Sequence, residues 1–437
     1  MSETVDFSRL ADWIDWLQQL NPDRIELGLQ RVRQVWQQLH AHIGSTVITV
    51  AGTNGKGSVV AMLEQVLRAS GHRVIAYTSP HLLRFNERIR IDGMEVDDGA
   101  LVQAFQRVAA AQHAVAGNLT YFEFTTLAAL WLISEQQPDV ALLEVGLGGR
   151  LDAVNIIAAD AAVLTSIGLD HMQWLGNSRA AIAAEKVAIA RPGALLVCGD
   201  TDPPAVIRQQ ARAVQARLLL IGRDFDMKLA TAADGSRVCR FCAGWLAQAI
   251  DLPLPLMSGQ HQRNNMACVM ALLTAPASPL VMPDITPATV SLPATRVPAR
   301  QQRLRTNPEL IVDVAHNEQA VAMLVDNLRR DAVKGRTRVV LAMLADKDVA
   351  AVISTLQPLA DQWLLPQIPG CRTLPPQQLQ QLLLAKGVAA ADICCYAGVT
   401  AAVSAALLQA QADDRIVVLG SFVTAAALLA EWPIGLV

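Results

Sequence analysis

One segment of the chain, residues 51–58 with the sequence AGTNGKGS, has the residue types of a phosphate-binding loop. Its glycines would let backbone N–H groups crowd around phosphate oxygens, and a helix starting directly after it would add partial positive charge. Lys56 would reach the β- and γ-phosphates of a nucleotide. The strict pattern G-x-x-x-x-G-K-[ST] is not met, because Val50 stands at its first position and Gly57 separates Lys56 from Ser58. An ordinary glycine-rich turn is the alternative, and the coincidence of strand, loop, lysine and helix favours phosphate binding.

Two further polar residues follow apolar runs that read as strands. Glu144 comes near the end of the run 139–145, and the glycine-rich turn after it leaves space where ligands of α/β proteins bind. A carboxylate beside a phosphate loop is most simply a Mg²⁺ ligand. His171 follows the run 161–167 and would emerge at the same edge. Alone it reads as an ordinary loop residue; beside Glu144 and the phosphate loop a ligand role is favoured, although imidazole is not a typical Mg²⁺ partner.

The elements that must position these residues alternate between short β-branched runs and longer amphipathic ones. Such alternation predicts βαβ units and parallel sheets. The expected strands of a first series are 46–51, 74–78, 139–145, 161–167 and 194–198, and its expected helices are 59–69, 97–115, 124–136 and 178–190. A second series has expected strands at 309–314, 338–343, 362–365 and 415–420.

The two series are separated by residues 274–300, which contain six prolines. This density predicts a linker without regular helix or central strand. We place the boundary near 292–298, which gives domains 1–295 and 296–437. The predicted fold class is α/β, with a P-loop-type, mostly parallel sheet domain followed by a smaller Rossmann-like domain.

The composition first raises the question of a membrane protein, because 52% of the 437 residues are hydrophobic and only 17% are charged. The two long uncharged stretches, 264–283 and 393–412, are interrupted by prolines or by polar residues and glycine, so we expect no spanning helix. We expect a packed helix leading into the linker at the first and a core-facing helix at the second. The N-terminus lacks a secretory pattern, which favours a cytoplasmic location.

Charge and cysteine content exclude further classes. The net charge of −3 gives no bulk electrostatic case for nucleic-acid binding. Seven cysteines, an odd number over a long chain, do not suggest a disulfide framework, and the lone C-x-x-C at 239–242 has no matching second pair.

Motifs in a fixed order resemble a known family. They are GTNGKGS (52–58), TSPHL (78–82), FNERIR (85–90), EVGLGGRLD (144–152), Asp170-His171, Glu185-Lys186, His261-Gln262 with Asn265, Arg300, and DVAHN (313–317). The chain resembles the ATP-dependent Mur ligase superfamily, and within it the folylpolyglutamate synthase/dihydrofolate synthase branch, from about Leu27 to Phe422. It departs from the branch pattern at Glu318, Ala345 and Val423, all in the predicted C-terminal domain.

The resemblance implies an ATP site and two Mg²⁺ ions. The ATP contacts would be Thr53, Asn54, Gly55, Lys56, Gly57, Ser58, Asn265 on the adenine side, Arg300 at the γ-phosphate, Asp313 at the ribose, and His316. The implied metal ligands are Ser79, Glu144, His171 and Lys186, and the implied catalytic residues are Lys56, Lys186 and His171.

Lys186 lies in an expected helix, where a lysine is ordinarily a solvated surface group. By resemblance it matches a lysine that family members carry as a carbamate, an anion able to bind the second Mg²⁺. Carbamate formation needs the neutral amine, so a partly desolvated site would help.

The resemblance also implies a pteroate site formed by Phe122, Glu123, Leu151, Asp152 and Ala153. Asp152 could hydrogen-bond a pterin ring and Phe122 could stack on it. Phe122 and Phe124 could equally be core residues.

The implied activity is ATP-dependent addition of L-glutamate to dihydropteroate and to reduced folates through an acyl phosphate. The partners would be these small molecules, without nucleic acid or membrane, and the chain would be a monomer. The alternatives are a single-activity folylpolyglutamate or dihydrofolate synthase, a muropeptide ligase, and a non-catalytic ATP-binding switch.

Overall fold

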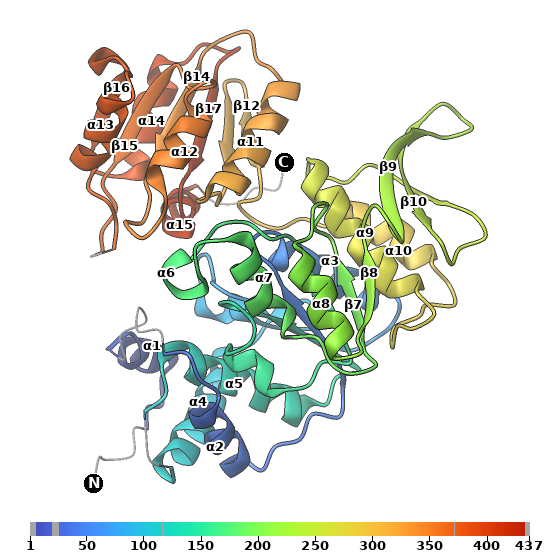
Figure 1. Cartoon of the computed structure of the whole chain (residues 1–437). Helices are drawn as coiled ribbons and strands as arrows, with labels where there is room; N and C mark the ends of the chain where they lie inside the picture. Colours follow the sequence, from blue (N-terminus) through green and yellow to red (C-terminus); the bar gives the residue numbers. More distant parts are fainter. Residues whose placement is uncertain (1–5, 20–25, 116–117, 371, 433–437) are drawn as a thin grey trace. The chain divides into compact units, whose positions relative to one another are not determined.

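The computed structural model describes residues 6–19, 26–115, 118–370 and 372–432, which divide into two compact units (Figure 1). Unit 1 comprises Met1–Ile167, Asn177–Pro255 and Arg263–Thr295. Unit 2 comprises Gly168–Gly176, Leu256–Gln262 and Arg296–Val437. Within these residues, unit 1 contains a large and a small sheet, and unit 2 contains one sheet.

The large sheet of unit 1 has the strand order β4-β3-β2-β5-β1-β6-β7-β8. The strands are β1 (Thr46–Ala51), β2 (Val74–Tyr77), β3 (Ile89–Ile91), β4 (Met94–Glu95), β5 (Val140–Glu144), β6 (Ala161–Leu164), β7 (Leu195–Cys198) and β8 (Arg217–Leu220). Strands β2, β5, β1, β6, β7 and β8 pair in parallel, while β3 and β4 form an antiparallel edge. The predicted parallel strands are confirmed. The short edge pair β3 and β4 was not predicted, and neither was β8, although residues 218–221 form a continuous apolar run.

The four helices predicted over 59–69, 97–115, 124–136 and 178–190 are present, together with helices that were not predicted. They are α1 (Leu10–Gln19), α2 (Gln30–Gln38), α3 (Lys56–Ala69), α4 (Asp98–His113), α5 (Tyr121–Gln136), α7 (Arg179–Val187), α8 (Ala205–Ala213), α9 (Gln260–Thr274) and α10 (Thr286–Ala294), with a 3₁₀ turn η2 at Ala153–Ile156. The first residues of α9, 260–262, are assigned to unit 2. Phe124 of α5 is fully buried against Trp13 and Phe105, so this residue is a core aromatic.

The prediction that residues 274–300 contain no regular helix is wrong, because α10 lies inside this segment. Pro287 stands in the first turn of α10, where the missing N–H would have had no helical partner. Pro293 stands at the penultimate position, where it affects only the last turn. The prolines therefore bound the helix without breaking it.

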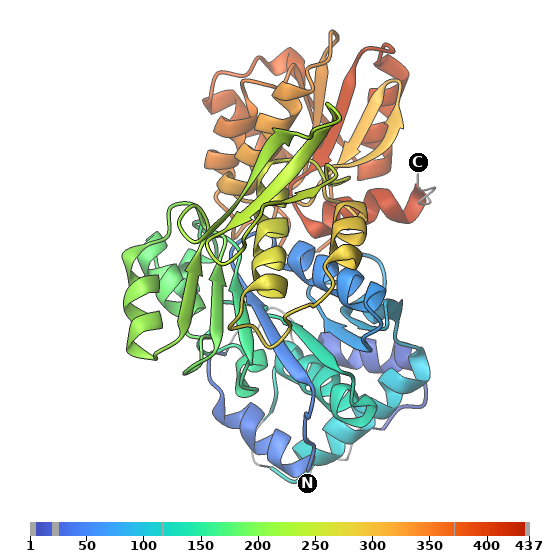
Figure 2. The ribbon, with the colours of Figure 1, turned by 90° about the vertical axis from the view of Figure 1, so that its right-hand side faces the viewer.

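A small antiparallel sheet, β11-β10-β9, also belongs to unit 1 and was not predicted. Its strands are β9 (Phe225–Thr231), β10 (Arg237–Ala243) and β11 (Ile250–Leu252). In Figures 1 and 2 these yellow-green strands stand apart from those of the large sheet. The C-x-x-C pair lies on β10, with Cys239 buried and Cys242 exposed, both as free thiols.

Unit 2 has a six-stranded sheet in the order β12-β13-β17-β14-β15-β16, parallel except for β12. Its strands are β12 (Gln302–Thr306), β13 (Glu309–Val312), β14 (Thr337–Leu341), β15 (Gln362–Pro366), β16 (Ile393–Tyr396) and β17 (Arg415–Leu419). Its helices are α6 (Met172–Leu175), α11 (Glu318–Arg330), α12 (Val349–Leu356), α13 (Pro376–Ala385), α14 (Val399–Gln409) and α15 (Phe422–Glu431). The predicted second series of strands and the α/β fold class are confirmed.

The expectation of one core-facing helix over 393–412 is wrong. Residues 393–396 form the edge strand β16, and only Val399–Gln409 are helical, starting after Gly398. The other uncharged stretch is occupied by α9, as expected. Within the described residues, no helix has both the length and the apolar composition to cross a bilayer.

Candidate active site

The glycine-rich loop lies between β1 and α3, and the tertiary structure requires its glycines. Gly55 has φ +92°, and a Cβ atom there would lie 2.8 Å from Oδ1 of Asn265. A Cβ atom at Gly52 would lie 1.8 Å from Oγ1 of Thr165. The Thr53 amide donates to the Ser166 carbonyl over 2.7 Å, so the loop rests on the segment after β6. Asn265, predicted as an adenine-side contact, is thus placed beside the loop.

Lys56 is the first residue of α3, and its ammonium lies over the loop. Nζ donates to the carbonyl oxygens of Gly52 at 3.1 Å and Thr53 at 3.2 Å. A cation at this point, together with the first N–H groups of a 14-residue helix, forms a concentrated positive end. The arrangement is suited to a polyphosphate.

Glu144 brings a carboxylate to the same edge of the sheet. It ends β5, which pairs with β1 so that Val50 and Glu144 are register partners. Its Oε2 accepts from the Ser79 amide at 3.3 Å and lies 3.6 Å from where a Gly57 Cβ would stand. The buried carboxylate therefore lies between Ser79 and the start of α3.

The donor set at this edge fits a magnesium ion. No group of three or more His, Cys, Asp or Glu able to hold a metal is found among the described residues. Mg²⁺ commonly takes only one or two carboxylates and completes its shell with phosphate oxygens and water. The Glu144 carboxylate, with Ser79 beside it and the start of α3 next to it, meets that requirement.

Lys186 is buried in α7, unlike an ordinary helical lysine. Because Gly149 has no side chain, its backbone can lie close to the backbone of α7: a Cβ there would lie 2.7 Å from the Glu185 carbonyl oxygen and 3.0 Å from Cα of Lys186. Burial raises the pKa of Asp152 to about 6, although backbone N–H donors and the nearby charge of Lys186 lower it. Lys186 therefore lies in the desolvated setting that its predicted carbamate would need.

The residues predicted to hold the pteroate group gather around the turn after β5 and the first turn of α5. The Phe122 ring packs on Gly146, where a Cβ would lie 2.4 Å from Cζ, and its centroid lies 6.4 Å from that of Tyr77. Phe122 and Leu151 are partly exposed, whereas Ala153 is buried. A planar ligand could therefore reach Phe122.

The two carboxylates of this group already have partners in the chain. Glu123 accepts from the Thr120 amide at 2.8 Å and from Nη2 of Arg31 at 2.9 Å. Asp152 accepts from the amides of Leu147 at 2.8 Å and Val154 at 3.0 Å. Both carboxylates hold the surrounding backbone in place.

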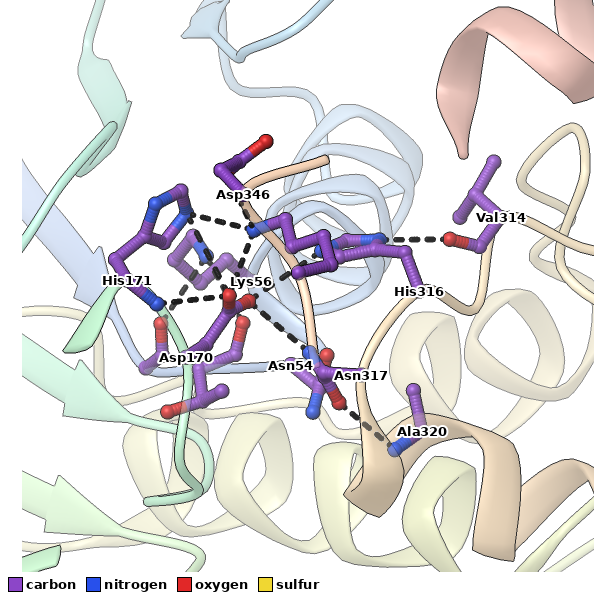
Figure 3. A network of polar contacts seen from close by, with 12 residues as sticks. Asn54, Lys56, Asp170, His171, Val314, His316, Asn317, Ala320 and Asp346 are labelled. Atoms are coloured by element: carbon purple, nitrogen blue, oxygen red, sulfur yellow. Dashed lines mark hydrogen bonds and ion pairs between the residues drawn. The ribbon is translucent and has the colours of Figure 1, made fainter. Parts of the chain in front are cut away.

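In unit 2, Asp170 is the centre of a polar network that the sequence motifs did not predict (Figure 3). Its Oδ1 accepts from Lys347 Nζ at 2.7 Å, and its Oδ2 accepts from Asn317 Nδ2 at 3.1 Å. The Nε2 atom of His316 lies 3.4 Å from Oδ2. Burial would raise the pKa of Asp170, but His316, His171 and Lys347 outweigh burial and hold it far below the usual range.

Three of the predicted nucleotide contacts, Arg300, Asp313 and His316, belong to unit 2. Asp313 is buried, and its oxygens accept from the amides of Gln301 at 2.7 Å and Ala315 at 2.6 Å. Burial raises its pKa, against the nearby charge of Arg300. Arg300 holds its guanidinium 5.2 Å from the Phe422 ring centroid, while Nδ1 of His316 lies 2.8 Å from the Val314 carbonyl oxygen.

Two family models account for most of the chain. The Mur ligase middle domain matches residues 50–273, and the Mur ligase, glutamate ligase domain matches residues 299–422. A dihydrofolate synthase/folylpolyglutamate synthase from Escherichia coli K12 is 37% identical over 97% of this chain and 95% of its own length. The chain belongs to the Mur ligase family. Within it, the chain belongs to the dihydrofolate synthase/folylpolyglutamate synthase branch, which confirms the resemblance.

Solved structures of this branch match this chain over nearly its whole length. Escherichia coli FolC in complex with DHPP and ADP has a TM-score of 0.88 and 35% identity, covering 99% of both chains. A bifunctional folylpolyglutamate synthase/dihydrofolate synthase with Mn, AMPPNP and L-glutamate bound has a TM-score of 0.87 and 35% identity, covering 99% of this chain and 100% of that one.

Proposed function

We propose that this chain is an ATP-dependent ligase that adds L-glutamate to dihydropteroate, forming dihydrofolate, and to reduced folates, forming folylpolyglutamates. The observation that carries the proposal is the meeting of the Glu144 carboxylate, the Ser79 backbone and the first turn of α3 at one edge of the sheet. A polyphosphate and a divalent cation can be held there together. Membership of the dihydrofolate synthase/folylpolyglutamate synthase branch supports the choice of substrates.

The loop and Lys56 position the reacting phosphate. The N–H groups of residues 53–58 and the Lys56 ammonium bind the β- and γ-phosphates, and Asn265, Arg300, Asp313 and His316 complete the nucleotide contacts. Glu144 and Ser79 would hold one divalent cation, and His171 and Lys186 would hold a second; such ions would supply charge neutralisation during phosphoryl transfer.

The reaction takes place in two displacements. A carboxylate oxygen of the acceptor attacks the γ-phosphorus, the bond to the β,γ-bridging oxygen breaks, and ADP leaves. The amine nitrogen of glutamate then attacks the acyl carbon, phosphate leaves with the bonding electrons, and the amine loses its proton. The protein contributes mainly positioning and electrostatic stabilisation.

On the acceptor side, Phe122 would stack on the pterin ring while Leu151 and Ala153 line its edge. Glu123 and Asp152 would act through the backbone that they hold, because their oxygens already accept backbone or arginine donors. The enzyme is proposed to work as a cytoplasmic monomer.

Carbamylation of Lys186 forms part of the proposal and has its own test. Carbon-13 NMR with labelled bicarbonate is expected to give a carbamate signal in the wild-type protein that Lys186→Arg lacks. An identical spectrum for both proteins would rule the modification out.

The activity test measures phosphate release with ATP, Mg²⁺ and L-glutamate, comparing dihydropteroate, a reduced folate and a muropeptide as acceptors. Release is expected with both pteridines. Lys56→Ala should abolish it with the fold intact, whereas Lys228→Ala, a change at a 76% exposed side chain of β9, should not alter it. No pteridine-dependent release would refute the ligase proposal.

The same assay separates the alternatives. Release with one pteridine alone indicates a single-activity synthase, and release with the muropeptide alone indicates a cell-wall ligase. ATP binding without acceptor-dependent release indicates a nucleotide switch, for which the buried Glu144 and Lys186 would have no evident use.

A further inference from the structure

Lys347 is a buried lysine to which neither the motifs nor the proposed reaction assigns a role. It follows β14, in the turn before α12, and its side chain is 7% exposed. Its Nζ lies 2.7 Å from Oδ1 of Asp170, 3.5 Å from Nε2 of His171 and 3.8 Å from Oδ2 of Asp346. All four residues belong to unit 2.

The contact with His171 restricts what that imidazole can bind. An ammonium group has only donors, so a hydrogen bond between it and Nε2 uses the nitrogen lone pair. A metal ion bound at Nε2 would need the same lone pair. A dication there would also stand within a few ångströms of the ammonium, in a buried setting where charge repulsion is weakly screened.

The rest of the network shows what remains once the ammonium leaves. Oδ2 of Asp170 keeps its contacts with Asn317 and His316. Oδ1 keeps the backbone N–H of His171 at 2.9 Å and loses its side-chain cation. A carboxylate oxygen and an imidazole nitrogen then face the same space, which are ligands that Mn²⁺ accepts.

We propose that Lys347 sets the metal affinity of the His171 site by acting as its resident cation. It pairs with Asp170 and covers Nε2 of His171, so a divalent ion binds at His171 only after the ammonium has moved away. The inference rests on the proposed role of His171 as a metal ligand.

The test compares two variants at Lys347 in the full-length protein without nucleotide. Lys347→Gln keeps N–H donors for Asp170 and removes the charge, while Lys347→Arg keeps the charge. Binding of Mn²⁺ is followed by the electron paramagnetic resonance signal of the free ion. We expect Lys347→Gln to lower the Kd for Mn²⁺ at least about tenfold and Lys347→Arg to leave it near the wild-type value.

Two controls assign the effect to the site. Adding His171→Ala to Lys347→Gln should abolish the gain in Mn²⁺ affinity. Lys334→Gln, which removes an exposed lysine of unit 2, should produce no such gain. Thermal unfolding checks that each variant folds. Equal Kd values for wild type and Lys347→Gln, undetectable binding by Lys347→Gln, or a gain that survives His171→Ala would each overturn the proposal. Since no ATP or acceptor is present, failure of the ligase proposal would appear separately, in the phosphate-release assay.

Discussion

Gly55 shows how a single residue in the loop depends on a distant part of the chain. Its positive φ is one constraint, and the side chain of Asn265, 2.8 Å from the site of a missing Cβ, is a second. Gly71, just after α3, has a similar φ of +87° with open space around it. Comparing substitutions at Gly55 and Gly71 therefore separates the effect of backbone strain from the effect of steric contact.

Gly55→Ala is expected to weaken ATP binding at least about tenfold, because the methyl group displaces Asn265 or the loop. Gly71→Ala should lower the free energy of unfolding by about 1 kcal/mol and leave the ATP affinity unchanged. Calorimetric titration with ATP and thermal unfolding measure the two effects. Equal losses of affinity in both variants would mean that strain alone is responsible.

Asp152 carries a second prediction at the residue scale. Its folded pKa of about 6 lies above the ordinary 3.8, so its favourable contribution to stability is complete below about pH 4 and is lost as pH rises through 6. The loss amounts to about 3 kcal/mol. Asp152→Asn should flatten the pH dependence of unfolding over that interval.

Bicarbonate adds a further outcome for Asp152. A carbamate on Lys186 would replace a nearby cation by an anion, so the pKa of Asp152 should rise when bicarbonate is added. Carbon-13 NMR of aspartate carboxyls measures both states. The absence of any aspartate titrating above pH 5 would contradict the assignment.

At the scale of elements, helix α5 positions Phe122 through a capping box. Thr120 and Glu123 exchange hydrogen bonds at its start, and Arg31 of α2 holds the second Glu123 oxygen. Helix α4 offers a comparison, since Asp97 caps it through the Ala100 amide at an exposed site.

Glu123→Ala should cost about 2–4 kcal/mol, because the cap is lost and Arg31 is left without this buried partner. The KM for the pteridine should rise more than kcat falls, because the change loosens the first turn of α5, which carries Phe122. Asp97→Ala should cost about 1 kcal/mol and leave the KM unchanged. Urea unfolding and steady-state kinetics test both; a Glu123→Ala protein with a wild-type KM would argue against the role of α5 in binding.

At the scale of the whole molecule, two units with separate hydrophobic cores imply that damage to one core should stay local. The sheet of unit 2 is held by buried ion pairs, among them Arg338 with Asp414 at 2.6 Å, and Arg415 with Glu309. Burial would raise the pKa of Asp414, but the amides of Gln411 and Arg336 and the Arg338 side chain hold it below the usual value.

Asp414→Asn should therefore destabilise unit 2 by about 3 kcal/mol near neutral pH, because Arg338 loses a buried partner. The lowered pKa means that the wild-type advantage exists above about pH 4 and disappears as pH falls further. Hydrogen exchange should speed up in β14 and β17 and remain unchanged in β1 and β5. Uniform acceleration in both units would contradict independent cores.

The sequence by itself determined the parallel strands, the phosphate loop and the family. These follow from local signals: apolar runs, glycine spacing and motifs that are continuous in the chain. It failed at α10, where prolines at the helix ends looked like helix breakers, and at β16, whose four residues are too short to separate from α14.

Only the tertiary structure decided which polar groups face one another. Lys347 and Asp170 are 177 positions apart, and Gly55 and Asn265 are separated by a similar span, so no local pattern links them. Burial of Lys186 and the position of the ammonium at Nε2 of His171 likewise depend on packing between distant segments. Desolvation and charge proximity set the chemistry of these groups, and both are properties of the folded chain.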